Sequence, residues 1–257
     1  MAARGGYGQY CGLARALETI GERWALLLVR DLLVGPRRFT DLARGLPRIP
    51  SNVLSTRLRE LEEAGVIERR LLPRPTGSVV YALTDRGRAL EDAVIALGRW
   101  GAEALGDPGE GEVITVESMT MALRTTFDRA AARGPRAVFE LRMGEVILHA
   151  TIAGARLEVA PGPAEAADLV IHAGPGLRRL MAGELTPAAA IEGGVVAIEG
   201  DPRLLERFAE VFRIGPPRAP RGQPKAEVTR GRSAAARATA STPGDGPRRT
   251  RGRSSRG

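Results

Sequence analysis

Residues 49–70 constrain the fold of this chain more than any other stretch, because they join a two-faced helix to a basic strand. They read IPSNVLSTRLRELEEAGVIERR. At about 100° per residue, Leu54, Leu58 and Leu61 fall within roughly a quarter of the helix circumference. The opposite side carries short hydrogen-bonding groups and one cation: Asn52, Ser55, Thr56 and Arg59. The leucines predict a stripe packed against a core.

The polar side of this helix is open to two interpretations. One is an ordinary solvated face, although Glu and Lys would favour a helix more than Ser, Asn and Thr do. The other is a recognition helix, whose short side chains near its N-terminus let the backbone sit deep in the major groove of DNA.

The segments around this helix favour the second interpretation. Helical patterns at 12–21, 23–36 and 39–47 precede it, and a brief break between Pro47 and Pro50 gives a helix-turn-helix plan. Two strand-like runs, GVIERRLLP and GSVVYALT, follow around the tight turn PRPTG. This hairpin carries Arg69, Arg70 and Arg74 on its first strand and tip, so the whole predicts a winged helix whose arginines reach phosphate.

A last helix is expected after Thr84, which caps it, with Asp85 in its first turn. Its sequence is DRGRALEDAVIALGRWGAEAL, and its apolar side consists of Leu90, Val94, Leu97, Trp100 and Leu105. Nothing in residues 1–105 obviously covers that side. A second copy of the chain is the expected cover, and a two-fold dimer matches a palindromic DNA site.

From Cys11 to about Gly101 the chain resembles the HxlR family of winged-helix transcriptional regulators, in order and in spacing. The motifs GPRRF, LSTRLRELEEAGVIERR and YALTDRG carry the resemblance. It implies a homodimer, built from the first and last helices, that binds operator DNA. Where the family usually has Ile-Ser-Pro, this chain has Ile49-Pro50-Ser51, so Ser51 is expected to cap the recognition helix one residue later. The expected DNA contacts are Arg38, Ser51, Asn52, Ser55, Thr56, Arg59, Arg70 and Arg74.

Cys11 is the single cysteine and has two interpretations. In some members of the resembled family a cysteine at this place senses oxidants or electrophiles, and a helix N-terminus lowers the pKa of a thiol. The alternative is a small, half-buried residue with no switching role. With one cysteine, only an intersubunit disulfide or a small-molecule adduct is available.

Residues 107–215 are expected to form a separate α+β unit after the Gly-, Pro- and acid-rich segment LGDPGEGE. Residues 137–162 read as strands with Gly144 and Gly154 as turns, and 167–174 reads as a further strand. Three helical stretches follow, with VVAIEG as a strand between them. Residues 137–212 resemble the later part of a sterol-carrier-protein-type lipid-binding domain, which implies an apolar ligand held between sheet and helices. The residues expected to line or support that cavity are Leu180, Met181, Ile191, Val195, Ile198, Phe208 and Phe212. The alternative is that these residues form an ordinary closed core.

Charge divides the chain into three parts. Residues 1–105 hold 16 basic and 12 acidic side chains, residues 106–215 hold 11 and 16, and residues 216–257 hold 11 and 2. A basic first part and tail suit a polyanion, whereas the acidic middle does not. The tail is rich in Pro, Gly, Ser, Ala and Arg, which predicts disorder, and it serves either as extra phosphate contact or only as a solubilising segment.

These observations predict a mainly α winged helix-turn-helix domain (1–106), an α+β sterol-carrier-like domain (107–215) and a disordered Arg-rich tail (216–257). No transmembrane run, signal peptide, metal set, cofactor motif or catalytic motif is evident. The expected protein is a cytoplasmic, dimeric, non-enzymatic regulator, commonly a repressor, that binds double-stranded DNA and senses an apolar effector. The alternative is a lipid carrier whose winged helix serves dimerisation or protein interaction.

Overall fold

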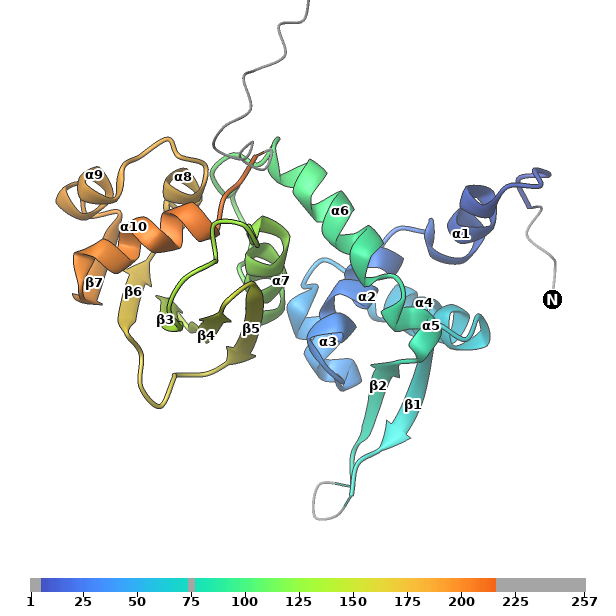
Figure 1. Cartoon of the computed structure of the whole chain (residues 1–257). Coiled ribbons are helices and arrows are strands. Elements are labelled where there is room, and N and C mark those ends of the chain that lie inside the picture. The colour runs from blue at the N-terminus through green and yellow to red at the C-terminus, as the bar shows by residue number, and fades with distance from the viewer. Residues whose placement is uncertain (1–5, 74–76, 216–257) are drawn as a thin grey trace, which may run out of the picture. The chain divides into compact units, whose positions relative to one another are not determined.

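The computed structural model describes residues 6–73 and 77–215. Arg74 and the predicted disordered tail lie outside these residues. The first part of the chain forms a winged helix (Figure 1) with the elements α1 (Gly12–Ile20), α2 (Ala25–Val34), α3 (Phe39–Gly45), α4 (Ser51–Glu63), β1 (Ile67–Leu71), β2 (Val79–Leu83), α5 (Asp85–Arg88) and α6 (Glu91–Ala102). The winged helix-turn-helix predicted from the sequence is therefore confirmed.

The winged helix is held together by leucines from α2, α3 and α4. Leu54, Leu58 and Leu61 of α4 are all buried, as their spacing predicts, and pack with Leu28 and Leu42. Strands β1 and β2 pair antiparallel, with Ile67 opposite Leu83 and Leu71 opposite Val79. The hairpin so formed is the wing.

Two details of this half differ from the sequence-based expectation. Pro50, not Ser51, is the N-cap of α4, and Ser51 is its first helical residue. The fixed φ of proline suits the extended backbone of the cap, here φ −66° and ψ 141°. The single helix expected after Thr84 is two helices, α5 and α6, with Ala89 and Leu90 between them. Thr84 does cap the first, since its hydroxyl accepts a hydrogen bond from the Gly87 N–H at 3.1 Å.

The second part of the chain is an α+β unit. It contains α7 (Val116–Thr126), β3 (Ala137–Met143), β4 (Val146–Ala153), β5 (Arg156–Pro161), β6 (Leu169–Ala173), α8 (Leu177–Met181), α9 (Pro187–Glu192), β7 (Val196–Gly200) and α10 (Pro202–Val211). The sheet order is β5-β4-β3-β6-β7, with β3 and β6 parallel and the other pairs antiparallel.

Turns and one side chain fix the order of these strands. Gly144 and Gly154 adopt φ values of 57° and 60° at the two hairpin turns, as the sequence predicts. Asp168 joins the two parallel strands, because its Oδ2 accepts a hydrogen bond from the Val138 N–H at 2.7 Å.

Aromatic rings fill the interior of the α+β unit. Phe127, Phe139, Phe208 and Phe212 lie with neighbouring ring centroids 4.8 to 6.4 Å apart, and the last three are fully buried. The residues expected to line a ligand cavity divide into two groups: Leu180, Met181, Phe208 and Phe212 are buried in this core, and Ile191, Val195 and Ile198 are half-buried against it.

Helix α7 belongs to both halves and was not predicted. Its side chains Met119 and Leu123 enter the core of the α+β unit. The helix also packs against α2 and α6 of the winged helix (Figure 1). On α6 it lies against Gly98, which faces Thr125, and the Arg99 Nε donates to the Thr125 carbonyl at 3.2 Å. Leu97, Trp100 and Leu105 remain exposed, whereas Leu90 and Val94 pack against the winged-helix core.

Gly87 provides a test of how tightly α5 sits against the wing. A Cβ at this position would lie 2.1 Å from the carbonyl oxygen of Val66, which is backbone and has no room to yield. We expect Gly87→Ala to lower the free energy of unfolding by about 1–3 kcal/mol. Chemical denaturation of the full chain measures this. The matched control is Gly101→Ala in α6, where a Cβ meets nothing within 4 Å; it should be neutral or stabilising, and equal losses for both variants would contradict the prediction.

Candidate nucleic-acid interface

The exposed face of α4 is the centre of the candidate interface. Ser51, Asn52, Ser55 and Arg59 are exposed, and Thr56 is half-buried. They lie opposite the three buried leucines of the same helix. The Ser55 hydroxyl donates to the Ser51 carbonyl oxygen at 2.9 Å, which satisfies it within the helix while its lone pairs remain free to accept. The face thus presents short polar side chains and one arginine.

Two neighbouring arginines of α4 have different environments. Arg57 is largely buried, and its guanidinium pairs with Glu60 and, at 2.8 Å, with Glu22. Arg59 is exposed, and its one ion-pair partner among the described residues is Glu63 at 3.9 Å. An exposed pair of that length contributes about 0–1 kcal/mol. Arg57 therefore fastens the helix to its own domain, whereas Arg59 can turn towards a phosphate or a base at little cost.

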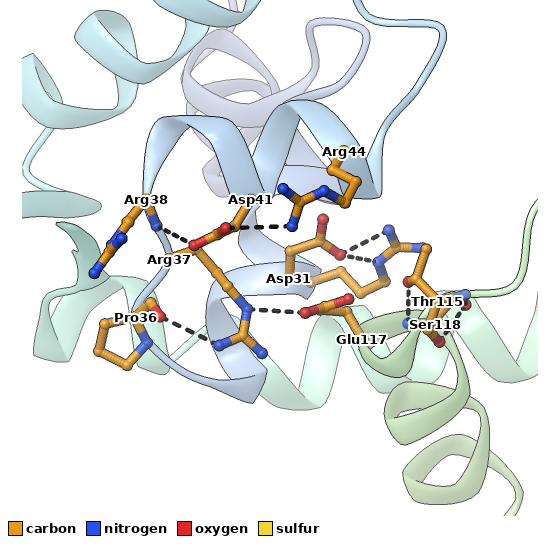
Figure 2. A network of polar contacts seen from close by, with 10 residues as sticks. Asp31, Pro36, Arg37, Arg38, Asp41, Arg44, Thr115, Glu117 and Ser118 are labelled. Carbon is orange, nitrogen blue, oxygen red and sulfur yellow. Dashed lines mark hydrogen bonds and ion pairs between the residues drawn. The ribbon is translucent and has the colours of Figure 1, made fainter. Parts of the chain in front are cut away.

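Arg38 precedes α3 and points outward. Its backbone N–H donates to Asp41 Oδ2 at 3.1 Å, which anchors the first turn of the helix. Figure 2 shows its guanidinium directed away from the Arg37–Glu117 ion pair. The side chain is exposed, so it is available to a polyanion.

The arginines of the wing are held by nearby carboxylates. Arg69 pairs with Glu62 of α4 at 2.9 Å and lies over the Tyr81 ring at 5.9 Å. The Glu62 hydrogen bond raises the pKa of the Arg69 guanidinium. Arg70 pairs with Glu68 two residues earlier on β1. A phosphate would therefore have to displace Glu68 to bind Arg70. Arg69, which was not among the expected DNA contacts, braces the wing on α4.

Sequence reasoning missed a buried carboxylate beside this surface. Asp31 of α2 is 1% exposed, and Arg30 Nε donates to its Oδ1 at 2.7 Å. Burial raises the pKa of the Asp31 carboxyl from 3.8 to about 6, against the opposing attraction of the Arg30 guanidinium. The sequence signal for a buried carboxylate was a single acidic residue within the mostly apolar run ALLLVRDLLV.

Arg37 is the second residue that the sequence did not single out. Its Nε donates to Glu117 Oε1 of α7 at 2.9 Å (Figure 2). Its main chain pairs with the wing, because Arg37 N–H donates to the Tyr81 carbonyl at 3.0 Å and Tyr81 N–H donates back at 2.8 Å. Arg37 thus links α7, the start of α3 and β2.

Cys11 lies at the N-terminus of α1 and is exposed. The backbone N–H groups of Ala14 and Leu13 lower the pKa of its thiol, although no capping hydrogen bond of ordinary geometry is formed. Cys11 is therefore not half-buried in the single chain. A sensing role for Cys11 stays a prediction.

The histidines do not form a reactive cluster within the described residues. His149 Nδ1 lies 3.0 Å from the Gly162 carbonyl, and His172 Nε2 lies 2.8 Å from Glu199 Oε1, each on a different strand. Among residues 6–73 and 77–215, no three acidic, histidine or cysteine side chains are placed to hold a metal ion. No helix in those ranges has the length and apolarity needed to cross a membrane.

Comparison with known proteins gives one family match, to the HxlR-like helix-turn-helix family over residues 19–108. The HTH-type transcriptional regulator YvaP of Bacillus subtilis is 37% identical over 89 residues, which are 35% of this chain and 82% of that protein. YodB, an HTH-type transcriptional regulator of the same organism, is 35% identical over 95 residues, or 37% of this chain and 84% of YodB. Among solved structures, the redox regulator HypR in its reduced form is 33% identical with a TM-score of 0.34, covering 35% of this chain and 90% of HypR. YvaP and YodB are HTH-type transcriptional regulators, and the family match lies in the winged-helix part of this chain.

The buried Asp31 predicts a specific dependence of stability on pH. Because its pKa is higher in the folded protein than in the unfolded chain, the folded protein holds the proton more tightly between pH 3.8 and about 6. The free energy of unfolding should therefore fall as pH rises through this range, by up to about 3 kcal/mol. Asp31→Asn should remove this fall, as measured by denaturation at several pH values. Asp85→Asn, at an exposed carboxylate, is the control and should keep the wild-type profile; an unchanged profile for Asp31→Asn would contradict the assignment.

Proposed function

The chain belongs to the HxlR-like helix-turn-helix family of transcriptional regulators, and from that membership we propose that it is a dimeric repressor that reads a two-fold operator through α4. The observation that carries this proposal is the exposed face of Ser51, Asn52, Ser55 and Arg59 opposite a fully buried leucine stripe. A recognition helix needs this combination, because its apolar side fixes its orientation while its polar side meets base edges. A lipid carrier does not need it.

Each of the exposed groups has a defined part in this proposal. Asn52 carries an amide, which pairs bidentately with adenine, and Arg59 carries a guanidinium, which pairs with guanine or phosphate. Arg38, Arg70 and Arg74 contact the phosphate backbone, which sets register and adds salt-dependent affinity. Ser51, Ser55 and Thr56 are short enough to let the helix backbone approach the bases.

Selection of bound fragments from random or genomic DNA, at two salt concentrations, tests the proposal. A shared two-fold sequence that persists at the higher salt supports it. Binding that weakens uniformly for all sequences as salt rises would leave only electrostatic attraction and overturn it.

Two substitutions on α4 test base reading. Asn52→Ala and Arg59→Ala should each reduce discrimination between the selected site and scrambled DNA by about 1–3 kcal/mol, because each removes a base-edge contact. The measurement is DNA affinity for both sequences by fluorescence anisotropy. Arg156→Ala is the charge-matched control, since Arg156 is exposed on β5 in the other half of the chain. Loss of affinity that is equal for both DNAs would reassign the residue to phosphate contact.

The dimer is proposed from exposed apolar side chains on α1 and α6. They are Leu13, Leu17, Leu97 and Trp100, and Trp100 is 76% exposed. A tryptophan this exposed is a strong candidate for an interface centre, where such residues often contribute 2 kcal/mol or more. In the family, the first and last helices of the winged helix form this interface, which places two copies of α4 for one two-fold site.

We expect Trp100→Glu to weaken dimerisation by at least about 30-fold, because it puts a charge at the centre of the interface. Analytical ultracentrifugation across a concentration series measures the dissociation constant. Leu71→Glu in the wing is the matched control, since Leu71 is 72% exposed and lies outside α1 and α6. A wild-type monomer at micromolar concentration, or a dimer unaffected by Trp100→Glu, would refute the interface.

The α+β unit is proposed to be a sterol-carrier-like domain that senses an apolar effector. Support comes from the resemblance of residues 137–212 and from a five-stranded sheet packed with helices. The interior of that unit is occupied by the phenylalanine cluster, however, so the effector needs a different place to bind. The effector would then bias the DNA affinity of the winged helix, which requires reciprocal coupling between the two sites.

A further inference from the structure

A cavity of about 1040 Å³ lies where α2, α6, α7 and α8 meet the segment 105–115. Its volume is at the upper end of the range for small-molecule sites. Small residues on facing helices create the space: Gly98, Gly101 and Ala102 recur at i, i+3 and i+4 on α6, and Ala122 faces them from α7. Side chains of ordinary size at these four positions would close the gap between the helices.

The wall of the cavity is rich in methionine. Met119, Met121, Met143 and Met181 all line it, and they are all the methionines within the described residues. They come from α7, β3 and α8, so the clustering arises from the fold and not from one run of sequence. Unbranched, polarizable methionine side chains adapt to ligands of different shape and are common at binding surfaces that accept several partners. Only Met181 belongs to the set that the sequence predicted for a pocket.

The charged groups of the wall are already engaged. Arg30 pairs with Asp31, and Arg48 donates to the Glu110 carbonyl at 3.1 Å. Arg178 pairs bidentately with Glu184 at 2.6 and 2.8 Å, while its buried Nε makes no hydrogen bond with the described residues and lies 3.7 Å from Asp107 Oδ1. An anionic ligand would therefore have to compete with existing partners. The Thr125 hydroxyl, in contrast, lines the cavity without a hydrogen-bond partner among the described residues. The wall favours an uncharged ligand with one hydrogen-bonding group.

We propose that this cavity binds an uncharged, apolar small molecule carrying a single hydroxyl or carbonyl group, and that it is the effector site of the protein. The binding part stands on the cavity alone, and the effector part rests on the proposed regulatory function. The site lies beside the phenylalanine core of the α+β unit and not within it. A hydroxyl or carbonyl on the ligand would pair with Thr125, while the rest of the molecule contacts methionine and leucine side chains.

Helix α7 connects the cavity to the candidate DNA interface. Met119 and Ala122 of this helix face the cavity, whereas Glu117 in its first turn holds Arg37. The main chain of Arg37 pairs in turn with Tyr81 of the wing. A ligand that shifts α7 therefore acts on a residue that is fastened to both α3 and β2. Such a connection gives allostery only if DNA and ligand change each other's affinity equally.

The cavity contains its own reporter, because Trp24 lines it and Trp100 is on the exposed side of α6. In a Trp100→Phe background of the full chain, Trp24 is the only tryptophan. We expect 1-decanol to change Trp24 fluorescence saturably and to displace the neutral dye Nile red. Decanoate, which has the same chain length and a charge, should require at least about tenfold higher concentration. Equal or tighter binding of decanoate would overturn the assignment to an uncharged ligand.

Filling the space tests whether the cavity itself is the site. Ala102→Phe with Ala122→Phe, added to the reporter background, should abolish decanol and Nile red binding. Ala130→Phe with Ala155→Phe is the matched control, since both alanines are exposed and neither lines the cavity. Circular dichroism verifies that both double variants fold. Binding that survives in the folded cavity-filled variant would overturn the proposal.

A DNA measurement on the wild-type chain separates the two parts of the proposal. With decanol present, the DNA dissociation constant should shift severalfold, and Glu117→Gln should bind decanol normally but show a smaller shift. Decanol binding without any shift in DNA affinity would overturn the effector role and leave the cavity as a binding site. Failure of the wild type to bind DNA with sequence preference would instead contradict the proposed function, and the fluorescence result would stand independently.

Discussion

The packing of α7 against α2 and α6 is the interaction on which the rest of this structure depends. Polar contacts fix the register of this packing at both ends of α7. Glu117 pairs with Arg37 near the start, and Arg124 Nη1 lies 3.2 Å from the Leu33 carbonyl and 3.3 Å from Glu91 near the end. The side chains of Arg37 and Glu117 are only 22% and 19% exposed. Breaking either pair would strand a half-buried charge, which costs more than the pair itself contributes.

Because α7 also supplies Met119 and Leu123 to the α+β core, the two halves share an element instead of merely touching. Close-packed cores resist continuous deformation, so a displacement of α7 is carried by both of them. The small residues Gly98, Gly101 and Ala102 on α6 loosen the same packing at one place. The contact between the halves is thus held by ion pairs near both ends of α7 and is less tightly packed beside Gly98, Gly101 and Ala102, where the cavity lies.

Sequence reasoning recovered the elements that have local signals. The leucine spacing of α4, the glycine turns at Gly144 and Gly154 and the Thr84 cap each depend on a few consecutive residues. Helix α7 was missed because its apolar residues serve two cores and leave no simple one-sided stripe, although Thr115 and Ser118 form a capping box at its start. The Arg37–Glu117 pair spans 80 positions, and no local pattern predicts a contact of that separation.

The sequence correctly predicted which side of α4 is exposed. The role of the residues on that side in binding DNA stays a prediction. The sequence placed Arg59 on the polar face, but it could not show that Arg57 is held by Glu22, because Glu22 comes from another part of the chain. The sequence also could not show that Arg70 is paired. Glu68 lies on the same side of β1, as the period-2 rule of strands predicts. Only the structure shows that the two exposed side chains form an ion pair, with which a phosphate would have to compete.

The polar face of α4 is tolerated because burial of the opposite face stabilises the helix in the folded protein. Ser51, Asn52, Ser55 and Thr56 each cost up to about 0.7 kcal/mol of helix propensity relative to alanine. Burial of Leu54, Leu58 and Leu61, at about 1.5–3 kcal/mol each as an upper estimate, exceeds that cost. Arg57 adds a fixed tie to Glu22. The buried leucines and Arg57 thus hold α4 in place from its inner face. The residues on its exposed face are not needed for folding, so they can be selected for the molecules that they contact.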